Sequence, residues 1–254
     1  MNTVVALMYH DVFNLSVTES GFQNIGAIKY KISRQSFEDQ IKTISNYCEK
    51  QQINKESICL TFDDGGISFL TIIAPILEKY GFKGYFFIST KLINAFGFLT
   101  AKNIVELDVR GHIIGTHSHS HPKNISELSY WQIKSEWVES TVILKAILKK
   151  SIEHASIPGG FFSSASEKAL FSIGVNVIFT SNPTSSIKFV NSKMIIGRYC
   201  ITQGMASEVI VNLLKPFSLS RIMFSLRWKA LKLIKLIFGR YYFNLRNKLL
   251  KIGI

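Results

Sequence analysis

Short apolar, β-branched runs alternate with segments of helical periodicity along most of the chain, and this alternation constrains the fold more than any other feature. Such alternation is typical of a parallel sheet that helices cover. It predicts an α/β fold, and both a barrel and an open doubly wound sheet satisfy it. The expected strands are Thr3–Tyr9, Ser57–Phe62, Lys83–Ser89, His112–Thr116, Gly174–Thr180 and Lys193–Cys200; the expected helices are Ser33–Lys50, Ile67–Tyr80, Thr100–Arg110, Ser126–Lys150, Ser164–Ile173 and Met205–Leu214.

Polar clusters follow several of these strands at their carboxyl ends, where functional groups gather in parallel α/β folds. Tyr9-His10-Asp11 follows the first strand, and Asp63-Asp64-Gly65-Gly66 follows the second. The sequence Thr-His-Ser-His-Ser-His-Pro at 116–122 follows the fourth, and Arg198 lies in the last. We therefore expect one polar site at this end of the sheet.

The second and third of these clusters contain residue types that can form a catalytic metal centre; each cluster alone would more often be a turn or a structural histidine pair, and their occurrence together favours the metal centre. Two adjacent carboxylates after an apolar strand are costly unless a positive group meets them. His117 and His121 are four residues apart, a spacing that places both imidazoles on one face of a helical turn. Two imidazoles and one carboxylate form a three-ligand site with open positions, as in catalytic zinc or iron(II) centres. The other carboxylate is then free to act as a general base.

Several motifs, in order along the chain, resemble those of the polysaccharide deacetylase (NodB-homology) family. LTFDDGG at 60–66 and the H-x-x-x-H of THSHSHP at 116–122 resemble the family's first two motifs. LMYHDV at 7–12 and KYKISRQSFEDQI at 29–41 are similar to the opening of many members, and IPGG at 157–160 resembles the third motif, which lines the active-site groove. The resemblance covers about residues 3–200 and implies a distorted, partly closed (β/α) barrel.

The resemblance also implies a set of roles for individual residues. Asp63 would be the catalytic base, and Asp64, His117 and His121 would hold a divalent ion, usually zinc in the family. Pro158 and Gly159 would line the substrate groove, with the Gly159 N–H stabilising the oxyanion of the reaction. The product would be acetate and a free amine on an amino sugar.

Three departures from the family pattern bear on this mechanism. The arginine that usually opens the third motif and holds the base is Ser156 here, and the aspartate of the fourth is missing, with Thr180 to Pro183 the nearest stretch. The histidine of the fifth, the usual general acid, is absent from residues 194–201. Arg198, which we expect among the substrate-binding residues with Pro158 and Gly159, can replace the missing cation beside Asp63, but a guanidinium cannot serve as an acid at neutral pH. We take His10 as the first candidate for the acid and His119 as the second.

The positive charge of the chain is concentrated in its last 44 residues, which we call the basic tail (211–254). The net charge is +13; ten basic and no acidic residues in the basic tail account for +10, which leaves +3 for residues 1–210. On a helical wheel of 221–240, five basic residues fall within about 140° of arc with Trp228 nearby: Arg221, Lys229, Lys232, Lys235 and Arg240. Arg227 is the outlier, and Leu226, Ala230, Leu233, Ile234 and Ile237 cluster opposite.

A basic amphipathic helix of this kind suits the surface of an anionic membrane, with about 1 kcal/mol per basic residue near the surface. The alternative is that the helix packs on the barrel. Nucleic acid is a weaker interpretation and we expect none as a partner, because no recognition motif accompanies the charge. A second basic–apolar stretch, Arg240–Lys251, follows Gly239.

Cysteine usage and the N-terminal residues favour a reducing compartment. Cys48, Cys59 and Cys200 are an odd, scattered set without a CxxC spacing, and residues 1–12 lack the basic segment of a secretory signal. We expect a cytoplasmic enzyme at the inner face of the cytoplasmic membrane, with a barrel domain at 1–210 and the basic tail as its membrane contact.

The predicted function is removal of acetyl groups from an N-acetylated glycan during bacterial surface-glycan assembly. The tail favours a lipid-linked glycan over a soluble oligosaccharide. An alternative from another class is a glycan-binding or scaffolding pseudoenzyme that keeps the metal site. The missing late histidine favours that alternative, and the intact Asp63 opposes it, because a binding protein needs no base.

Overall fold

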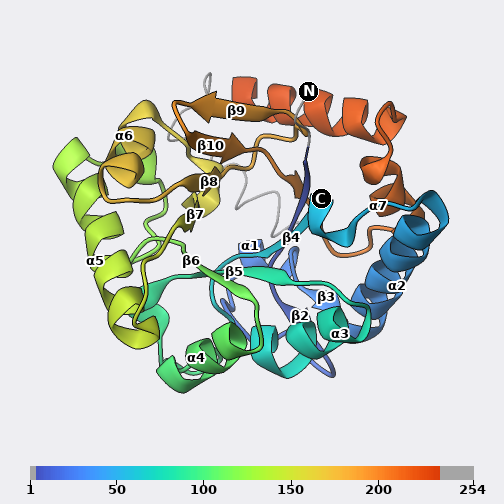
Figure 1. Cartoon of the computed structure of the whole chain (residues 1–254), viewed down its shortest axis with the longest axis horizontal. Helices are drawn as coiled ribbons and strands as arrows, with labels where there is room; N and C mark the ends of the chain where they lie inside the picture. The colour runs from blue at the N-terminus through green and yellow to red at the C-terminus, as the bar shows by residue number, and fades with distance from the viewer. Residues whose placement is uncertain (1–3, 235–254) are drawn as a thin grey trace.

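The protein forms a curled nine-stranded sheet with helices around its outer face (Figure 1). The computed structural model describes residues 4–234. The strand order is β11-β1-β4-β5-β6-β7-β8-β10-β9, and all neighbours are parallel except β9 and β10. The sheet bends into a half-barrel, which confirms the predicted distorted, partly closed barrel and excludes the open doubly wound sheet.

Each predicted strand and helix that lies within the described residues is present with small differences in its bounds, except that the predicted strand Lys193–Cys200 is divided into two. The strands of the large sheet are β1 Val5–Tyr9, β4 Ile58–Phe62, β5 Gly84–Ile88, β6 Ile113–Thr116, β7 His154–Ser156, β8 Val177–Phe179, β9 Ile187–Val190, β10 Lys193–Ile196 and β11 Tyr199–Cys200. The main helices are α2 Arg34–Gln51, α3 Ala74–Lys79 after a π-helical turn at Phe69–Ile73, α4 Ala101–Val109, α5 Tyr130–Leu148, α6 Ser164–Ser172 and α7 Ser207–Leu214. A small parallel pair, β2 Val12–Phe13 and β3 Ile32–Ser33, and the short helix α1 Ile25–Ile28 complete the N-terminal part.

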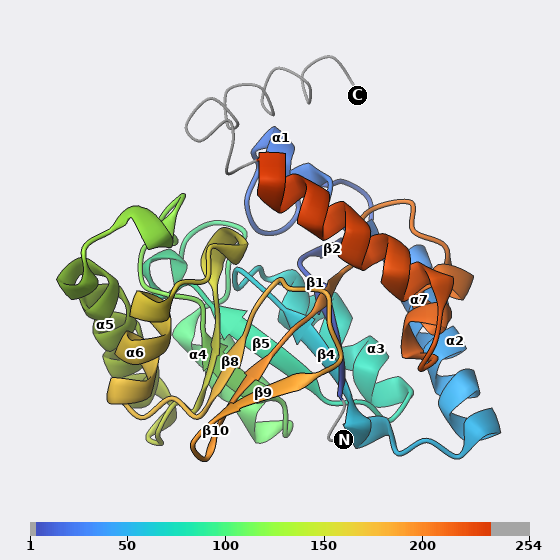
Figure 2. The ribbon, with the colours of Figure 1, turned by 90° about the horizontal axis from the view of Figure 1, so that it is seen from above.

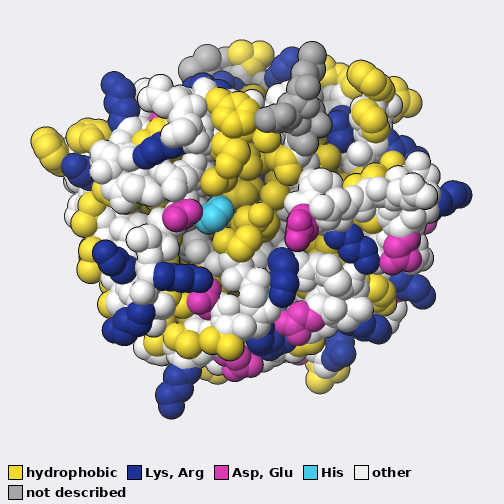
Figure 3. All heavy atoms as spheres, viewed as in Figure 1, with side chains coloured by type: hydrophobic (Ala, Val, Ile, Leu, Met, Phe, Trp, Pro, Cys, Tyr) yellow, Lys and Arg dark blue, Asp and Glu magenta, His cyan; other side chains and the backbone are white. Residues whose placement is uncertain are grey.

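Side chains alternate between the two faces of each strand, so the sheet has an outer and an inner core. Leu7 and Tyr9 of β1 pack outward with the helices, whereas Ala6 points into the barrel with Phe87 and Phe179. A small residue is required at Gly115 of β6, because a Cβ there would lie 2.6 Å from the Phe87 ring. In the space-filling view of Figure 3, hydrophobic side chains gather over the middle of the face, and Lys and Arg side chains are spread around its edge.

The barrel is partly closed by the segment that was expected to be one strand, Lys193–Cys200. The structure divides it at Gly197–Arg198: β10 pairs with β8, and β11 pairs with β1 at the other end of the strand order. The chain thus crosses between the two sides of the opening. The break falls at Gly197 because a Cβ there would lie 2.2 Å from the Asn182 carbonyl oxygen, so only glycine allows this close approach.

One predicted helix start was wrong. Ser126 lies in a 3₁₀ turn, Ile125–Glu127, and the long helix α5 begins after Ser129, whose hydroxyl accepts from the Gln132 N–H while Gln132 bonds back to the Ser129 backbone. This reciprocal capping box satisfies two N-terminal donors at once. The predicted start at Ser33 was correct, because its hydroxyl caps α2.

The chain continues past the barrel as a helix, Leu219–Ile234, that crosses the front of the molecule in Figure 2. The predicted domain boundary after residue 210 falls inside α7, whose Ile210, Leu213 and Leu214 are buried in the outer core. Residues 235–240 of the predicted tail helix and the second basic stretch Arg240–Lys251 lie outside the described residues. Among residues 4–234 no single helix has the length and hydropathy to cross a membrane, and α7 and Leu219–Ile234 meet that test only as a pair bent by 94°.

Candidate metal and catalytic site

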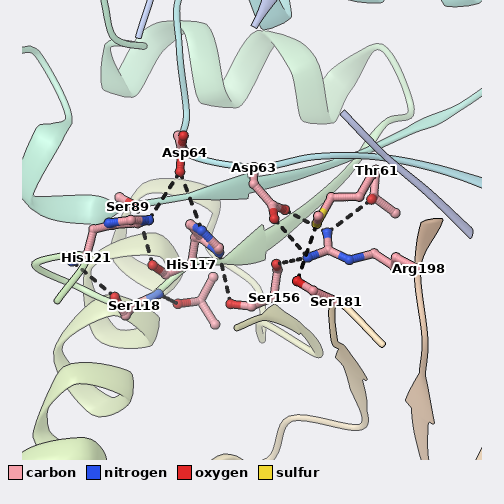
Figure 4. Close-up of polar contacts among 12 residues, drawn as sticks. Thr61, Asp63, Asp64, Ser89, His117, Ser118, His121, Ser156, Ser181 and Arg198 are labelled. Atoms are coloured by element: carbon pink, nitrogen blue, oxygen red, sulfur yellow. Dashed lines mark hydrogen bonds and ion pairs between the residues drawn. The ribbon is translucent and has the colours of Figure 1, made fainter. Parts of the chain in front are cut away.

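Asp64, His117 and His121 lie together at the carboxyl ends of β4 and β6, as predicted (Figure 4). One Asp64 carboxylate oxygen is 3.5 Å from His117 Nε2 and 3.3 Å from His121 Nε2, and the three ligand atoms all lie within 4.8 Å of one another. Two ligands of a tetrahedral zinc ion, each about 2.0–2.1 Å from the metal, are about 3.3–3.4 Å apart. The spacing of the three donors therefore fits one small divalent ion.

The backbone at Asp64 explains how two adjacent carboxylates come to serve different partners. Asp64 has a φ of 90°, a conformation that L-residues rarely adopt, and Gly65 follows with a φ of 94°. Figure 4 shows the consequence: the Asp64 side chain points to the two histidines, whereas Asp63 points to Arg198. The unusual φ falls on Asp64 and on Gly65, the first of the two glycines that follow the aspartates.

The orientation of His117 is fixed by the neighbouring strand. Its Nδ1 lies 2.9 Å from the Ser156 carbonyl oxygen at the end of β7, so Nδ1 donates and the ring is held with Nε2 facing Asp64. His121 lies above it with a ring-centroid distance of 5.1 Å, and the Phe22 ring packs against His121 at 5.1 Å. Burial alone would raise the pKa of Asp64, but its bonds to the two imidazoles hold that pKa well below the usual value.

Arg198 binds Asp63 inside the barrel, at the end where β4 terminates, and every N–H donor of its guanidinium forms a hydrogen bond. Two bonds of 2.8 Å run to the two carboxylate oxygens of Asp63. The other three donors bind the Thr180 carbonyl oxygen, the Thr61 hydroxyl and the Ser156 hydroxyl. Because Arg198 is 0% exposed and all five of its N–H groups are used, it holds Asp63 and has no donor free for a substrate, which does not favour its expected place among the substrate-binding residues.

The same contact sets the charge of Asp63. Burial would raise the pKa of this carboxyl group, which is 2% exposed, but the Arg198 charge lowers the pKa below its usual value. Asp63 is therefore an anion at neutral pH. Both of its oxygens are hydrogen-bonded, and each retains a further lone pair.

The two candidates for the general acid lie in different surroundings. His10 is mostly buried, burial lowers its pKa, and the charges of Asp64, Asp63, His117 and Arg198 all act on it. Its Nδ1 is a buried atom without a hydrogen-bond partner among the described residues. His119 instead contacts Thr90 Oγ1 at 3.0 Å and Glu139 at 3.3 Å through its two ring nitrogens. The geometry favours His10 over His119.

The predicted groove residues lie after β7, at the same end of the barrel as the metal ligands. Pro158 is buried, whereas Gly159 is exposed and has a φ of 61°, which favours glycine. A Cβ at Gly159 would lie 3.0 Å from the Phe161 ring. Gly159 thus remains a candidate for contact with substrate through its backbone, and Pro158 supports the turn beneath it.

Three residues of the site were not identified from the sequence. Ser156 serves both halves of the site, since its carbonyl oxygen fixes His117 and its hydroxyl binds Arg198. Thr61 accepts from Arg198 and donates to the Leu7 carbonyl oxygen. Phe22 reaches His121 from the loop before α1, and no motif marks it. The only sequence signal for the role of Ser156 is its place at the start of the third motif, and that place indicates a missing arginine and not a serine that binds Arg198.

Comparison with known proteins adds evidence that is independent of this geometry. A family model described as polysaccharide deacetylase matches residues 50–178, the stretch that contains Asp63, Asp64, His117, His121 and Gly159. The peptidoglycan-N-acetylglucosamine deacetylase of Bacillus cereus is 28% identical over 138 residues, which are 48% of this chain and 48% of that protein. The chain spans about half the length of the curated relatives it matches.

Solved structures of low sequence identity share the fold. The deacetylase PplD of Streptococcus pyogenes, determined in complex with acetate, has a TM-score of 0.69 at 21% identity, and the match covers 84% of this chain and 99% of that one. IcaB from Ammonifex degensii has a TM-score of 0.63 at 19% identity, and the match covers 80% of this chain and 93% of that one. Both matches extend well beyond the residues of the family model.

Proposed function

The chain belongs to the polysaccharide deacetylase family, and from this premise we propose that it is a metal-dependent hydrolase that removes acetyl groups from N-acetylated sugars of a polysaccharide or a lipid-linked glycan. The observation that carries the proposal is the joint site, in which a buried Asp–His–His group and a separate buried carboxylate share one end of the barrel. Relatives named for peptidoglycan N-acetylglucosamine and for chitin support this substrate class.

Asp64, His117 and His121 would hold the metal, for which we propose Zn²⁺. The donor set, one carboxylate and two imidazoles, and its spacing suit zinc with an open position. When bound, the ion would supply Lewis acidity toward the acyl carbonyl and would lower the pKa of the attacking water. Ser156 contributes by keeping the Nε2 lone pair of His117 directed at the site.

Asp63 would take the proton of the attacking water as general base. Its ionised state supports this role, and Arg198 keeps the carboxylate in one orientation through two parallel bonds. Arg198 comes from the β10–β11 crossing, so the segment that partly closes the barrel also positions the base.

His10 would pass a proton to the leaving amine from its protonated state, which the charges of Asp64 and Asp63 favour and burial opposes. Its buried Nδ1 has no partner among the described residues, and a substrate group or water can supply one. The exposed Gly159 backbone would donate to the oxyanion that forms at the acyl carbon. These two roles rest on position and on family resemblance together.

We place this activity in the assembly of bacterial surface glycans, at the inner face of the cytoplasmic membrane. The peptidoglycan deacetylase relative supports the first part of that proposal. The three cysteines, which are free, and the basic tail support the second.

A second candidate function is glycan binding without turnover. One observation favours it: the guanidinium of Arg198 occupies both oxygens of Asp63 and makes this carboxylate a weaker base. One assay distinguishes the two functions: acetate release from a panel of N-acetylated glycans, measured with added zinc and with a chelator. Zinc-dependent release supports the hydrolase, whereas glycan binding without release from any member supports the second candidate.

A further inference from the structure

The helix Leu219–Ile234 presents its apolar side to solvent. Seven large apolar side chains of this helix are between 37% and 79% exposed. Leu231 lies outside the arc of the other six, which we call the apolar stripe: Leu219, Ile222, Met223, Leu226, Leu233 and Ile234. At 100° per residue they fall within about 120° of arc, so they form one continuous strip along the helix. An exposed apolar strip of this length marks a contact surface.

The opposite side of the helix faces the barrel. Arg221 donates to the Leu213 carbonyl oxygen at 2.8 Å and to the Ser185 hydroxyl at 3.0 Å, and its guanidinium lies over the Tyr199 ring. Phe224 meets the same ring edge-on at 5.8 Å. The basic side of the predicted amphipathic helix is therefore the side that is fixed to the protein, at least at Arg221, and the apolar side is left without a protein partner among residues 4–234.

Exposed cations border the apolar stripe on both edges. Lys229 lies about 20° beyond one edge and Arg227 about 20° beyond the other, and both are exposed. Apolar side chains flanked by long basic ones suit a lipid surface, where the apolar groups enter the acyl boundary and the cations reach the headgroups.

Charge distinguishes between the possible occupants of the apolar stripe. The basic tail contains no acidic residue, so a second copy docked symmetrically through the same face would bring Arg227 and Lys229 against cations. An anionic lipid surface meets both features of the stripe at once. We propose that the apolar stripe docks on the surface of an anionic membrane, with the helix lying in the plane of the interface.

The direction of the helix adds a consequence for the active site. In Figure 2 the helix rises from α7 toward the level of α1 and β2, the end of the barrel at which β1 and β4 terminate. With the helix in the plane of the interface, docking would therefore place that end, with His10 and Asp63, beside the membrane surface. This consequence rests on the proposed function and favours a glycan carried on a lipid as the substrate.

The test measures binding of the full chain to vesicles of phosphatidylcholine alone and of phosphatidylcholine with phosphatidylglycerol. We expect preferential binding to the anionic vesicles that salt weakens without abolishing, because only its electrostatic part is screened. Leu219→Gln, Leu226→Gln and Leu233→Gln combined should weaken binding at least about tenfold. The matched control, Val109→Gln with Val142→Gln, changes exposed apolar residues of α4 and α5 and should bind like the parent.

A charge pair completes the design. Arg227→Glu with Lys229→Glu should remove the preference for anionic vesicles, whereas Lys42→Glu with Lys50→Glu on α2 should keep it. Equal binding by the parent and the stripe variant, no binding by the parent, or a parent dimer that the stripe variant dissociates would each overturn the proposal. Acetate release from a soluble glycan is measured in parallel for the parent and the stripe variant. If neither protein releases acetate, the proposed function is contradicted, whereas the membrane proposal is judged by vesicle binding.

Discussion

Arg198 and Asp63 form a buried ion pair in which two parallel N–H···O bonds, each of 2.8 Å, join groups 135 residues apart in the chain. The resemblance to the family places an arginine at position 156, and the structure has Ser156 there with its hydroxyl accepting from Arg198. The cation that holds Asp63 thus comes from the crossing between β10 and β11, and the residue at position 156 binds this cation instead of supplying it.

The first prediction concerns this ion pair. Arg198→Ala leaves the Asp63 carboxylate buried without a cation and should lower the free energy of unfolding by about 3–5 kcal/mol. Urea denaturation followed by circular dichroism measures the loss. Lys188→Ala is the control, because Lys188 pairs with Glu167 at the surface and an exposed pair contributes about 0–1 kcal/mol. Equal effects of the two changes would show that the Arg198 pair has no special weight in the fold.

The second prediction concerns the metal ligands. His117→Ala or Asp64→Ala leaves two protein ligands, and since loss of an outer-shell partner alone costs about 10–100-fold in affinity, loss of a ligand should cost at least about 100-fold. Zinc content after dialysis against a weak chelator measures it. His119→Ala should keep the metal, because both of its ring nitrogens contact other groups. A zinc content in His117→Ala like that of the parent places the ion elsewhere.

The third prediction concerns pH and His112, a buried residue away from the site. Its Nδ1 accepts from the Gly84 N–H at 3.0 Å and its Nε2 lies 2.9 Å from Glu78, so the folded state holds a neutral ring. Burial lowers the pKa of His112 below its ordinary 6.5. As the pH falls through 6.5, His112 binds a proton in the unfolded chain before it does so in the folded protein. The contribution of His112 to the free energy of unfolding is therefore complete above that pH and decreases below it, by at most about 1.4 kcal/mol per pH unit.

His112→Asn keeps an acceptor near the Gly84 N–H and cannot titrate. The difference in unfolding free energy between pH 7.5 and pH 5.5 should therefore be smaller in this variant than in the parent. His10 and His154, whose pKa values burial also lowers, titrate in both proteins and leave the comparison intact. The same pH dependence in parent and variant would mean that His112 does not carry this effect.

Most of the fold and the Asp–His–His cluster could be predicted from the sequence because their signals are local. The buried strand β4 is apolar throughout and is followed at once by its two carboxylates, and the histidine pair is contained in seven residues. β7 and β9 were missed because they are only three and four residues long, and β9 is a partly exposed edge strand that pairs antiparallel with β10.

The contacts of Arg198 were beyond what the sequence alone could establish. The guanidinium reaches Asp63, Thr61 and Ser156 because the chain breaks at Gly197 and crosses to the other edge of the barrel, and the Asn182 carbonyl that requires the glycine comes from another loop. The direction of the tail helix was likewise set by tertiary contacts. Arg221 and Phe224 dock on Tyr199, and the helical wheel could not say which side would face the barrel.

The most direct test of the account is acetate release by Asp63→Asn compared with the parent, on an N-acetylated glycan with zinc present and zinc content measured in both. The amide is close in size and cannot accept the proton of the attacking water, so release should fall by about 10²–10⁴ while the metal stays bound. A parent that releases acetate only with metal, and a variant that holds zinc yet is inactive, is the predicted result. Unchanged turnover in Asp63→Asn with its zinc in place would contradict the assignment of Asp63 as the base.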